Sequence, residues 1–315
     1  MPSTKLTLAF YNLENLFDTL KDPNILDADF TPHGDLKWNH ERYTQKLNGL
    51  AKTIAQVGKA ETGQAPALIG VAEVENKKVL NDLLQTEALH TLNYDFVHHN
   101  SPDERGIDTA LLYDKNRFEV LESRSYSLHL QTAQGVRDFT RDILYVEGKL
   151  AGVAVFVLVN HWPSRGEGVA ISEPKRIAAA ERNREIIQEI QARDPEARIL
   201  IMGDFNDDPQ SIAVRDHLVS TDFYNPMVFL LTRYAGSLNH RGDWYLFDQI
   251  ILSPNWMKAY DNPLEYEKSA IYNPEYLKEQ EGKYRGNPLR TYAGDKYLGG
   301  LSDHFPVYTI FKLED

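Results

Sequence analysis

The chain contains no cysteine. This absence excludes disulfide bonds, thiolate metal sites and a cysteine nucleophile, so any metal ion must be held by oxygen or imidazole ligands. No apolar run approaches the roughly 20 residues that a membrane-spanning helix needs, and we therefore expect no stable membrane insertion. The first residues, Met1 to Lys5, lack the charged and apolar regions of a signal peptide. A trimmed export signal would leave the same sequence, so a cytoplasmic location is only the default expectation.

Basic residues are scarce: 34 Lys and Arg stand against 46 Asp and Glu, which gives a formal net charge of −12. Proteins that grip long duplex DNA by its backbone usually carry the opposite sign, because phosphate neutralisation supplies much of their affinity. The charge argues against a processive DNA binder, and among nucleic acids it favours short or single-stranded ones. It still allows a phosphate ester that is reached through a bound cation. Nothing in the sequence identifies a protein partner.

No repeat, low-complexity tract or Gly/Ser linker divides the chain, and we expect one domain over residues 1–315. Apolar residues make up 42% of the chain, enough for a substantial core. Helical spacing predicts helices along Tyr43–Val57, Lys77–Leu84 and Ser172–Gln191, the last capped by Ser172. Apolar runs and alternation predict strands at Leu6–Tyr11, Ala67–Val74, Thr109–Tyr113, Phe118–Leu128, Ile143–Leu150, Val153–Val159, Arg198–Gly203, Leu246–Leu252 and Phe305–Phe311.

Many strands and few helices indicate an α/β fold in which two sheets pack together with helices outside. The segment from about 255 to 298 is rich in Tyr, Pro, Asn, Glu and Lys and has little periodicity. We interpret it as a long surface excursion between two core strands. Such a loop either shapes a substrate pocket or is a neutral insertion.

Two polar clusters follow apolar runs. In Leu200 to Pro209, a buried strand ends at Gly203 and is followed by Asp204 and Asn206, which share a face if the strand geometry persists. A carboxylate and an amide placed together suit a water nucleophile or a hydrated cation, although a polar loop would show the same residues. Near the other end, Asp303-His304 can divide cation binding and proton handling, or form a capped turn.

Similar polar ends occur on the other predicted strands. The full set is Asn12, Glu73, Asn160-His161, Asp204 with Asn206, Asp248 and Asp303-His304. Carboxylates that converge in a cleft repel each other and lose hydration unless a cation is present. A cluster of the four acids is therefore most easily explained by Mg²⁺, with Mn²⁺ as a substitute, because both prefer oxygen ligands.

These motifs resemble the endonuclease/exonuclease/phosphatase superfamily, which includes pancreatic-type deoxyribonucleases, abasic-site endonucleases, sphingomyelinases and inositol polyphosphate phosphatases. The resemblance covers residues 6 to 311 in family order. It rests on Tyr11-Asn12-Leu13-Glu14-Asn15, Ala72-Glu73-Val74, Asn160-His161-Trp162-Pro163, Gly203-Asp204-Phe205-Asn206, Asp248-Gln249-Ile250-Ile251 and Ser302-Asp303-His304. It implies a four-layer α/β sandwich and Mg²⁺-dependent hydrolysis of a phosphate ester.

The resemblance also implies roles for individual residues. Glu73 is similar to the principal metal ligand, with Asn12 and Asp303 near the metal or its waters. Asp204 is similar to the group that orients or deprotonates the attacking water, and Asn206 to a phosphate contact. His304, held by Asp248, is similar to the imidazole that polarises the phosphate. His161 stands where the deoxyribonucleases carry a second histidine that acts as an acid for the leaving oxygen, and Asp108 where its carboxylate partner would be.

Some residues depart from the family pattern or remain secondary. Ala72 replaces a common Gln before Glu73, and Glu75 is the fallback metal ligand if the strand continues. Arg105 and Arg165, with Asn160, are candidate substrate contacts; for both arginines a surface salt bridge is the alternative. Without an acid to pair with in the sequence, His33, His40, His98 and His99 are interpreted as structural or exposed. Asp207 and Asp208 are interpreted as helix-capping residues ahead of Pro209.

The leading functional hypothesis is a Mg²⁺-dependent, nuclease-like phosphodiesterase that uses in-line attack of water. The main alternative is a phosphomonoesterase acting on a phosphorylated small molecule or lipid headgroup. A dedicated acid at His161 would favour a diester, whose alkoxide leaving group is poor. A lipid-docking hairpin has one candidate, Val228-Phe229-Leu230-Leu231, which a buried segment explains equally well. A non-catalytic binding protein on the same fold is the remote alternative.

Overall fold

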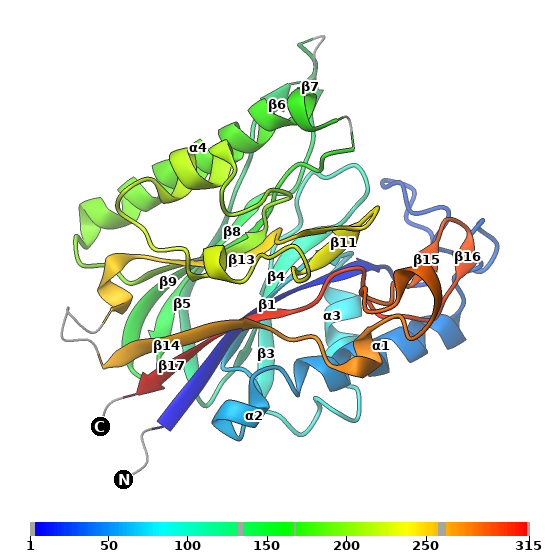
Figure 1. Ribbon diagram of the computed structural model, residues 1–315, viewed down its shortest axis with the longest axis horizontal. Coiled ribbons are helices and arrows are strands. Elements are labelled where there is room, and N and C mark those ends of the chain that lie inside the picture. Colours follow the sequence, from blue (N-terminus) through cyan, green and yellow to red (C-terminus); the bar gives the residue numbers. More distant parts are fainter. Residues whose placement is uncertain (1–3, 132–134, 167, 258–262, 314–315) are drawn as a thin grey trace.

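The computed structural model describes residues 4–131, 135–166, 168–257 and 263–313. Two mixed β-sheets form its centre (Figure 1). The six-stranded sheet has the order β14 (Leu264–Ile271), β17 (Val307–Leu313), β1 (Thr4–Leu16), β2 (Leu68–Val74), β4 (Asp108–Asp114) and β3 (Tyr94–His98). The five-stranded sheet has the order β13 (Asp248–Leu252), β10 (Ile199–Asp204), β9 (Val153–His161), β8 (Ile143–Leu150) and β5 (Phe118–Tyr126).

Short ribbons extend from the sandwich. They are β6 (Leu130–Gln131) with β7 (Arg137–Asp138), β11 (Leu238–His240) with β12 (Asp243–Tyr245), and β15 (Tyr292–Ala293) with β16 (Lys296–Tyr297). The last two ribbons lie in segments that the sequence does not mark as strands. Residues of both ribbons line hollows at the candidate site.

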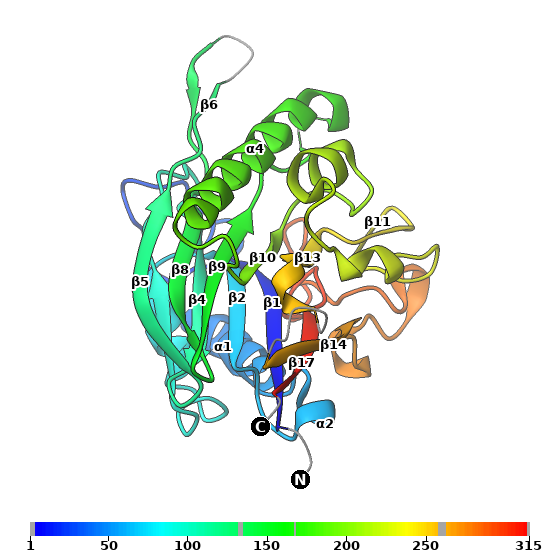
Figure 2. The ribbon, with the colours of Figure 1, turned by 90° about the vertical axis from the view of Figure 1, so that its left-hand side faces the viewer.

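Helices cover the outer faces of the two sheets, so the layers run helix, sheet, sheet, helix (Figure 2). The six-stranded sheet carries α1 (His40–Ile54), α2 (Lys59–Thr62) and α3 (Lys77–Leu84), and the five-stranded sheet carries α4 (Val169–Arg193). Single turns and short helices are η1 (Ala213–Val219), η2 (Pro226–Phe229), η3 (Pro254–Trp256), η5 (Glu275–Leu277) and η6 (Gly282–Tyr284). Among the described helices, none has the length and apolar character of a membrane span. The predicted four-layer α/β sandwich is confirmed.

Three apolar layers, one between the sheets and one under the helices on each side, explain why the strands appear in the sequence as continuous apolar runs. In β1, Ala9, Tyr11 and Leu13 pack under α1 and α3, while Leu8 and Phe10 pack between the sheets. In β9, alternate residues divide in the same way between the centre and the α4 side. Each fully buried large apolar side chain contributes roughly 1.5–3 kcal/mol. The layers therefore fix the two sheets face to face.

The helices α1 and α4 both begin about one turn before their predicted starts at Tyr43 and Ser172. Asn39 and Asn76 cap α1 and α3 by accepting hydrogen bonds from the backbone of the first turn. By contrast, α4 begins at Val169, and Ser172 lies inside it instead of capping it. The Ser172 hydroxyl donates to the Gly168 carbonyl at 2.8 Å and accepts from Arg176. The predicted cap is thus wrong, because the helix starts one turn earlier than the apolar stripe.

The 255–298 segment is not a surface excursion throughout. Its residues Leu264–Ile271 form β14, an edge strand that pairs antiparallel with β17. A register shift between Tyr266 and Lys268 interrupts the pairing. An extra residue in a strand reverses the alternation beyond it, so the period of two is hidden in the sequence. The predicted strand ending in Leu128 also stops earlier, at Tyr126.

Candidate active site

Polar strand ends from both sheets meet at one edge of the sandwich and line a hollow of about 380 Å³. β1 runs parallel to β2, and β9 runs parallel to β10, so these strands present their carboxyl ends together. In register, Asp204 lies between His161 of β9 and Asp248 of β13. The predicted residues that line the hollow are Glu73, Arg105, His161, Asp204, Asn206, Asp303 and His304.

His304 forms the best-defined pair in the hollow. Its Nδ1 lies 2.7 Å from Oδ2 of Asp248, whose side chain is fully buried. Its Nε2 faces Asp204 at 4.0 Å and Asp303 at 3.9 Å. Burial alone would lower the pKa of His304, but Asp248 and Asp204 outweigh it and raise the pKa well above its usual value. The imidazole is therefore a cation that points its second nitrogen into the hollow.

Asp204 lies between two imidazoles. Its Oδ2 accepts from Nδ2 of Asn12 at 3.0 Å and lies 3.8 Å from Nε2 of His161. Its Oδ1 accepts from the Asn206 backbone at 2.8 Å. Burial raises the pKa of Asp204 to about 6; the His304 cation opposes this rise and Asp248 adds to it. A carboxyl with a pKa near neutrality can accept a proton from water at ordinary pH.

Glu73 and Asn12 stand on the facing sheet. Nδ2 of Asn12 donates to Oδ2 of Asp204 and lies 3.4 Å from Oε1 of Glu73, so one amide links the acids of both sheets. The Asn12 oxygen accepts from the Glu14 backbone. With its oxygen engaged and its nitrogen turned to the acids, Asn12 positions Glu73 and Asp204. Asn12 thus adjoins Glu73, and its predicted place near the metal or its waters stays a prediction.

The backbone is left-handed at four residues around the hollow. Glu14, Asn15, Glu73 and Asn206 have φ of 46°, 55°, 63° and 48°. This region costs a non-glycine residue roughly 1–2 kcal/mol, and such strain clusters at functional sites. At Glu73 the turn shifts the register of β2 and aims the carboxylate at the hollow. The alternation behind the fallback assignment of Glu75 ends there: Glu75 is buried elsewhere and accepts from the Asp18 backbone at 2.6 Å.

His161 lacks the carboxylate partner that the sequence predicted. Its Nε2 lies 3.8 Å from Glu73 and Asp204, whereas its buried Nδ1 has no partner among the described residues. Asp108 instead pairs with Nε2 of His98 at 3.0 Å and accepts from Ser101. The predicted Asp108–His161 pair is therefore wrong, as is the interpretation of His98 as unpaired. Burial, then Arg141 and Arg105, lower the pKa of His161 well below its usual value, so this imidazole is neutral.

Two predicted substrate contacts are internal. Asn160 is fully buried, and its side-chain oxygen accepts from Trp162 and Asn183. Arg165 donates to the Asn206 carbonyl at 2.9 Å, pairs with Asp207, and lies over the Phe247 ring. Neither lines the hollow. Arg165 therefore positions the loop after β10, and Asn160 joins the end of β9 to α4; the predicted substrate contacts of both are corrected accordingly.

Two acids of the loop after β10, Asp207 and Asp208, also anchor it to the rest of the fold. Asp207 is paired with the fully buried Arg176 at 2.8 Å, and Asp208 accepts from the Leu246 backbone at 2.9 Å. No helix begins at Pro209, so the predicted capping role of these two acids is wrong. Asn206 itself lines the hollow, with its amide nitrogen donating to the Trp162 carbonyl at 3.0 Å.

A buried lysine beside the hollow, Lys46, was not predicted from the sequence. Nζ of Lys46 donates to the Thr291 hydroxyl at 2.8 Å and to the Glu14 carbonyl, while the Glu14 carboxylate accepts from the Thr291 backbone at 2.7 Å. Burial, followed by Asp303, raises the pKa of Glu14 to about 7, and Lys46 opposes this rise. A charged residue at Lys46, within the apolar stripe of Tyr43, Leu47 and Leu50, was the available signal.

Arg290 was missed as well. It lines the hollow and donates to Asp303 at 2.5 Å. Its segment has no periodicity, so no sequence signal marked it. Asp303, predicted as a metal-proximal acid, is thus placed between an arginine and the His304 imidazole.

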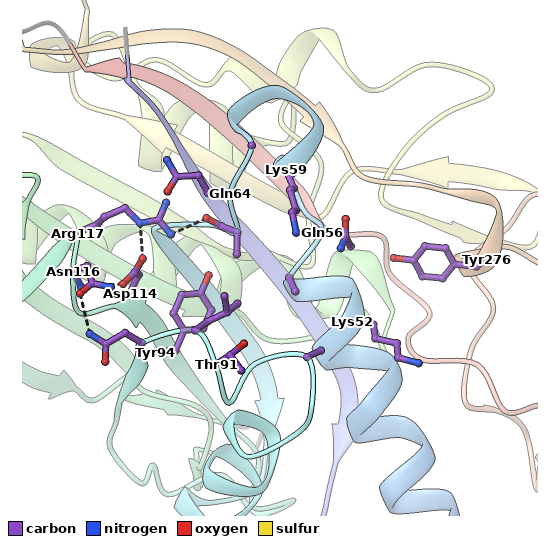
Figure 3. Close-up of a pocket in the computed structure, with 16 residues that line it drawn as sticks. Lys52, Gln56, Lys59, Gln64, Thr91, Tyr94, Asp114, Asn116, Arg117 and Tyr276 are labelled. Carbon is purple, nitrogen blue, oxygen red and sulfur yellow. Dashed lines mark hydrogen bonds and ion pairs between the residues drawn. The ribbon is translucent and has the colours of Figure 1, made fainter. Parts of the chain in front are cut away.

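A separate hollow of about 880 Å³ lies away from this chemistry (Figure 3). It is lined by the end of α1, the start of β3 and the end of β4. These strand termini lie at the opposite end of the six-stranded sheet from the carboxyl end of β2. Its charged side chains include Lys52, Lys59 and the Arg117–Asp114 pair. None of the predicted site residues lines it.

Comparisons with known proteins agree with this geometry. The sequence profile of the Endonuclease/Exonuclease/phosphatase family matches residues 7–313. No curated protein sequence matches significantly. Among solved structures, a mannosyl-6-phosphatase from Bacteroides thetaiotaomicron is 19% identical, with a TM-score of 0.60 over 97% of this chain and 99% of that one.

Similar solved structures also include TDP2 from D. rerio. Its complex with a single strand DNA product is 17% identical to this chain, with a TM-score of 0.56 over 98% of this chain and 99% of that one. Truncated TDP2 from Caenorhabditis elegans is 18% identical, with a TM-score of 0.58 over 98% and 97%. At these identities the likeness establishes the fold.

Proposed function

Because this chain belongs to the endonuclease/exonuclease/phosphatase family, we propose that it hydrolyses a phosphate ester by metal-assisted, in-line attack of water, with a phosphodiester as the leading substrate. The observation that carries the proposal is the position of Asp204. It lies in a water-accessible hollow between the His304 cation and the neutral His161, opposite Glu73. In-line displacement at phosphorus requires a proton acceptor for water and a positive field on the phosphate oxygens.

The residues of the hollow fit a divalent cation. Glu73 and Asp303 both line it and offer oxygen ligands, which Mg²⁺ and Mn²⁺ prefer. Asp204, Asp248 and His304 also have ligand atoms within 4.8 Å of one another, but the short bond between His304 and Asp248 engages that nitrogen. We therefore assign metal binding to Glu73, assisted by Asp303. A cation there would withdraw charge from the phosphate and stabilise the leaving oxygen.

Water activation is assigned to Asp204. Its Oδ1 is held by the Asn206 backbone and its Oδ2 by Asn12, so the carboxylate cannot rotate freely. The proton from water goes to the Asp204 carboxylate, whose pKa of about 6 allows it to accept and release a proton near neutral pH. Asp204 in this role needs its charged form, which the neighbouring His304 cation favours.

Phosphate binding is assigned to His304 and the two arginines that line the hollow. The protonated His304 presents Nε2 to the hollow while Asp248 fixes Nδ1, which sets the ring orientation. Arg105 and Arg290 add planar guanidinium groups, and Asn206 lines the same wall. His161 is a neutral hydrogen-bonding group at the phosphate; nothing in its surroundings keeps it protonated as an acid.

The second candidate is hydrolysis of a phosphomonoester on a small molecule. One observation favours it: His304, Arg105 and Arg290 all line the hollow, so several donors can meet the additional charged oxygen of a monoester. One similar structure is a mannosyl-6-phosphatase and another is TDP2 with a single strand DNA product, so both ester classes occur on this fold. A short or single-stranded nucleic acid fits the diester proposal better than a long duplex, given the net charge of −12.

Side-by-side hydrolysis of bis-nitrophenyl phosphate and nitrophenyl phosphate, with Mg²⁺, Mn²⁺ or a chelator, tests the proposal. We expect metal-dependent cleavage, faster for the diester, and a loss of about 10²–10⁴-fold in Asp204→Asn. Asp295→Asn, an exposed acid in the turn between β15 and β16, is the matched control and should keep the wild-type rate. Metal-independent turnover, or an active Asp204→Asn, would refute the mechanism. Preference for the monoester would select the second candidate.

A further inference from the structure

A second hollow, of about 520 Å³, adjoins the reaction hollow. The two share Arg290 and Asp303, which form an ion pair of 2.5 Å between them. The second hollow is built from the β11–β12 ribbon and from the chain between Glu279 and Leu298. A group bonded to the reacting phosphate can therefore extend past the ion pair into this space.

The walls of the second hollow are ordered by backbone contacts. Glu279 and Asn287 are joined by a bond from the Glu279 amide to the Asn287 carbonyl at 2.8 Å, and Gly286 donates to the Glu279 carbonyl at 2.8 Å. The Asn287 side chain donates to Asn239 of β11 at 3.3 Å, which links the two walls. At Gly300, an added Cβ would lie 1.9 Å from the Leu289 carbonyl oxygen, so this close approach requires glycine.

The free side chains of this hollow combine one acceptor with several donors. The Glu279 carboxylate is half-buried and makes no hydrogen bond or ion pair within the described part of the chain. Arg241 and His240 also have no side-chain partner there, and Lys283 only approaches the Tyr284 ring, at 5.4 Å. A carboxylate only accepts hydrogen bonds, whereas Arg and Lys only donate them.

Hydroxyl groups satisfy both kinds of side chain, because a hydroxyl donates one hydrogen bond and accepts others. A second phosphate would meet Arg241 and Lys283 but would be repelled by Glu279. An apolar tail would remove water from the half-buried Glu279 carboxylate without replacing its hydrogen bonds, and this loss is unfavourable. Tyr284 and Pro288 add apolar surface on which the C–H face of a ring can lie.

From this lining we propose that the second hollow binds the sugar ring of a phosphorylated sugar or nucleotide, with Glu279 accepting from its hydroxyls. The inference rests on the proposed function for the reacting phosphate and names the group attached to it. Arg241 and Lys283 hold further hydroxyl or ring oxygens from the rim. The Arg290–Asp303 pair lies where the sugar joins the phosphate.

Calorimetric titration separates this inference from catalysis. The probes are inorganic phosphate, glucose 6-phosphate and uridine 5′-monophosphate, each added with Mg²⁺ to the Asp204→Asn protein, in which turnover is expected to be about 10²–10⁴-fold slower. We expect at least one sugar phosphate to bind about tenfold or more tightly than phosphate. Adding Glu279→Gln should remove that gain, because the amide replaces a charged acceptor of similar size. Glu281→Gln, an exposed acid of the same loop outside the hollow, should leave the gain intact.

Each outcome of the titration either supports or overturns the inference. Equal binding of all three probes, or a gain that survives Glu279→Gln, overturns the inference. A gain for glucose 6-phosphate alone identifies a free sugar phosphate, and a gain for uridine 5′-monophosphate alone identifies a nucleotide. The proposed function fails separately, if the wild-type protein cleaves neither nitrophenyl ester with metal; the calorimetric comparison still decides on the hollow.

Kinetics adds a second readout where the wild-type protein is active. For Glu279→Gln, we expect the loss in kcat/KM on a sugar-bearing ester to exceed the loss on the matching nitrophenyl ester by about tenfold, mainly through KM. An equal loss on both would mean that Glu279 supports the fold of the site, and would overturn the sugar assignment.

Discussion

Replacing Glu75 by glutamine should stabilise the protein at neutral and alkaline pH. The Glu75 side chain is only 8% exposed and its Oε2 accepts from the Asp18 backbone at 2.6 Å. Burial raises the pKa of Glu75 to about 7; the bond from Asp18 opposes this rise, and the carboxylates of Asp18, Asp27 and Asp22 add to it. Glutamine keeps the accepting oxygen and removes the charge.

The size and sign of the effect follow from proton linkage. A rise in pKa from 4.5 to about 7 corresponds to about 3 kcal/mol, and residual water contact reduces this to about 2 kcal/mol. Between pH 4.5 and pH 7 the folded protein holds a proton that the unfolded chain has released. Stability of the wild type therefore falls as pH rises through this window, and the full penalty persists above it.

Urea unfolding at pH 5 and pH 8, in the presence of a chelator, measures this difference. Glu75→Gln should exceed the wild type by about 2 kcal/mol at pH 8, with most of that advantage gone at pH 5. The exposed Glu87→Gln is the control for a general charge effect and should shift neither value by more than about 0.5 kcal/mol. A gain of equal size at both pH values would refute the linkage argument, and a loss at pH 8 would show that the charged form is stabilised in the fold.

Three further outcomes test the assignments of the site. Asp108→Asn should lower the free energy of unfolding by about 1–3 kcal/mol, because the charge-assisted hydrogen bonds of Asp108 are lost. Its kcat should stay within about threefold of the wild type. A loss of kcat without destabilisation would restore the predicted catalytic role of Asp108. Gly203→Ala should destabilise by about 1–3 kcal/mol and slow turnover, because its Cβ would lie 2.4 Å from the Asn160 carbonyl oxygen; unchanged melting and rate would contradict this. His161→Ala should lose rate equally on nitrophenyl and phenyl diesters, and a larger loss on the phenyl ester would show that His161 is an acid after all.

The sequence predicted the chemistry of the site better than its pairings. Seven predicted residues line one hollow. Six of them lie at or near the termini of predicted strands, which meet on this side of the sandwich, and Arg105 lies in the loop before β4. Strand ends can be recognised in the sequence because the apolar pattern of the buried strand stops there. The assignment of His304 to Asp248 agrees with the 2.7 Å contact, since each lies at the start of a strand that the sequence marks clearly.

The partner of His161 was mispredicted for a physical reason. Whether Asp108 meets His161 or His98 depends on which strand lies beside β4 and in what register. β3 pairs with β4 so that His98 stands opposite Ala110, two residues from Asp108. The strand Tyr94–His98 has no clear alternation and was not predicted, so the competing histidine had no assigned position.

The second hollow shows why substrate choice is harder to predict than reaction type. Five strands with a recognisable apolar pattern, β1, β2, β9, β10 and β13, place Asn12, Glu73, His161, Asp204 and Asp248. Glu279, by contrast, is placed by backbone bonds within an aperiodic segment, and Arg241 by a turn in which it and Gly242 both have positive φ. Such segments tolerate change without loss of the core. If the sugar inference holds, relatives that share the strand ends and Arg290 but differ at Glu279 and Arg241 should keep the reaction and accept a different group on the phosphate.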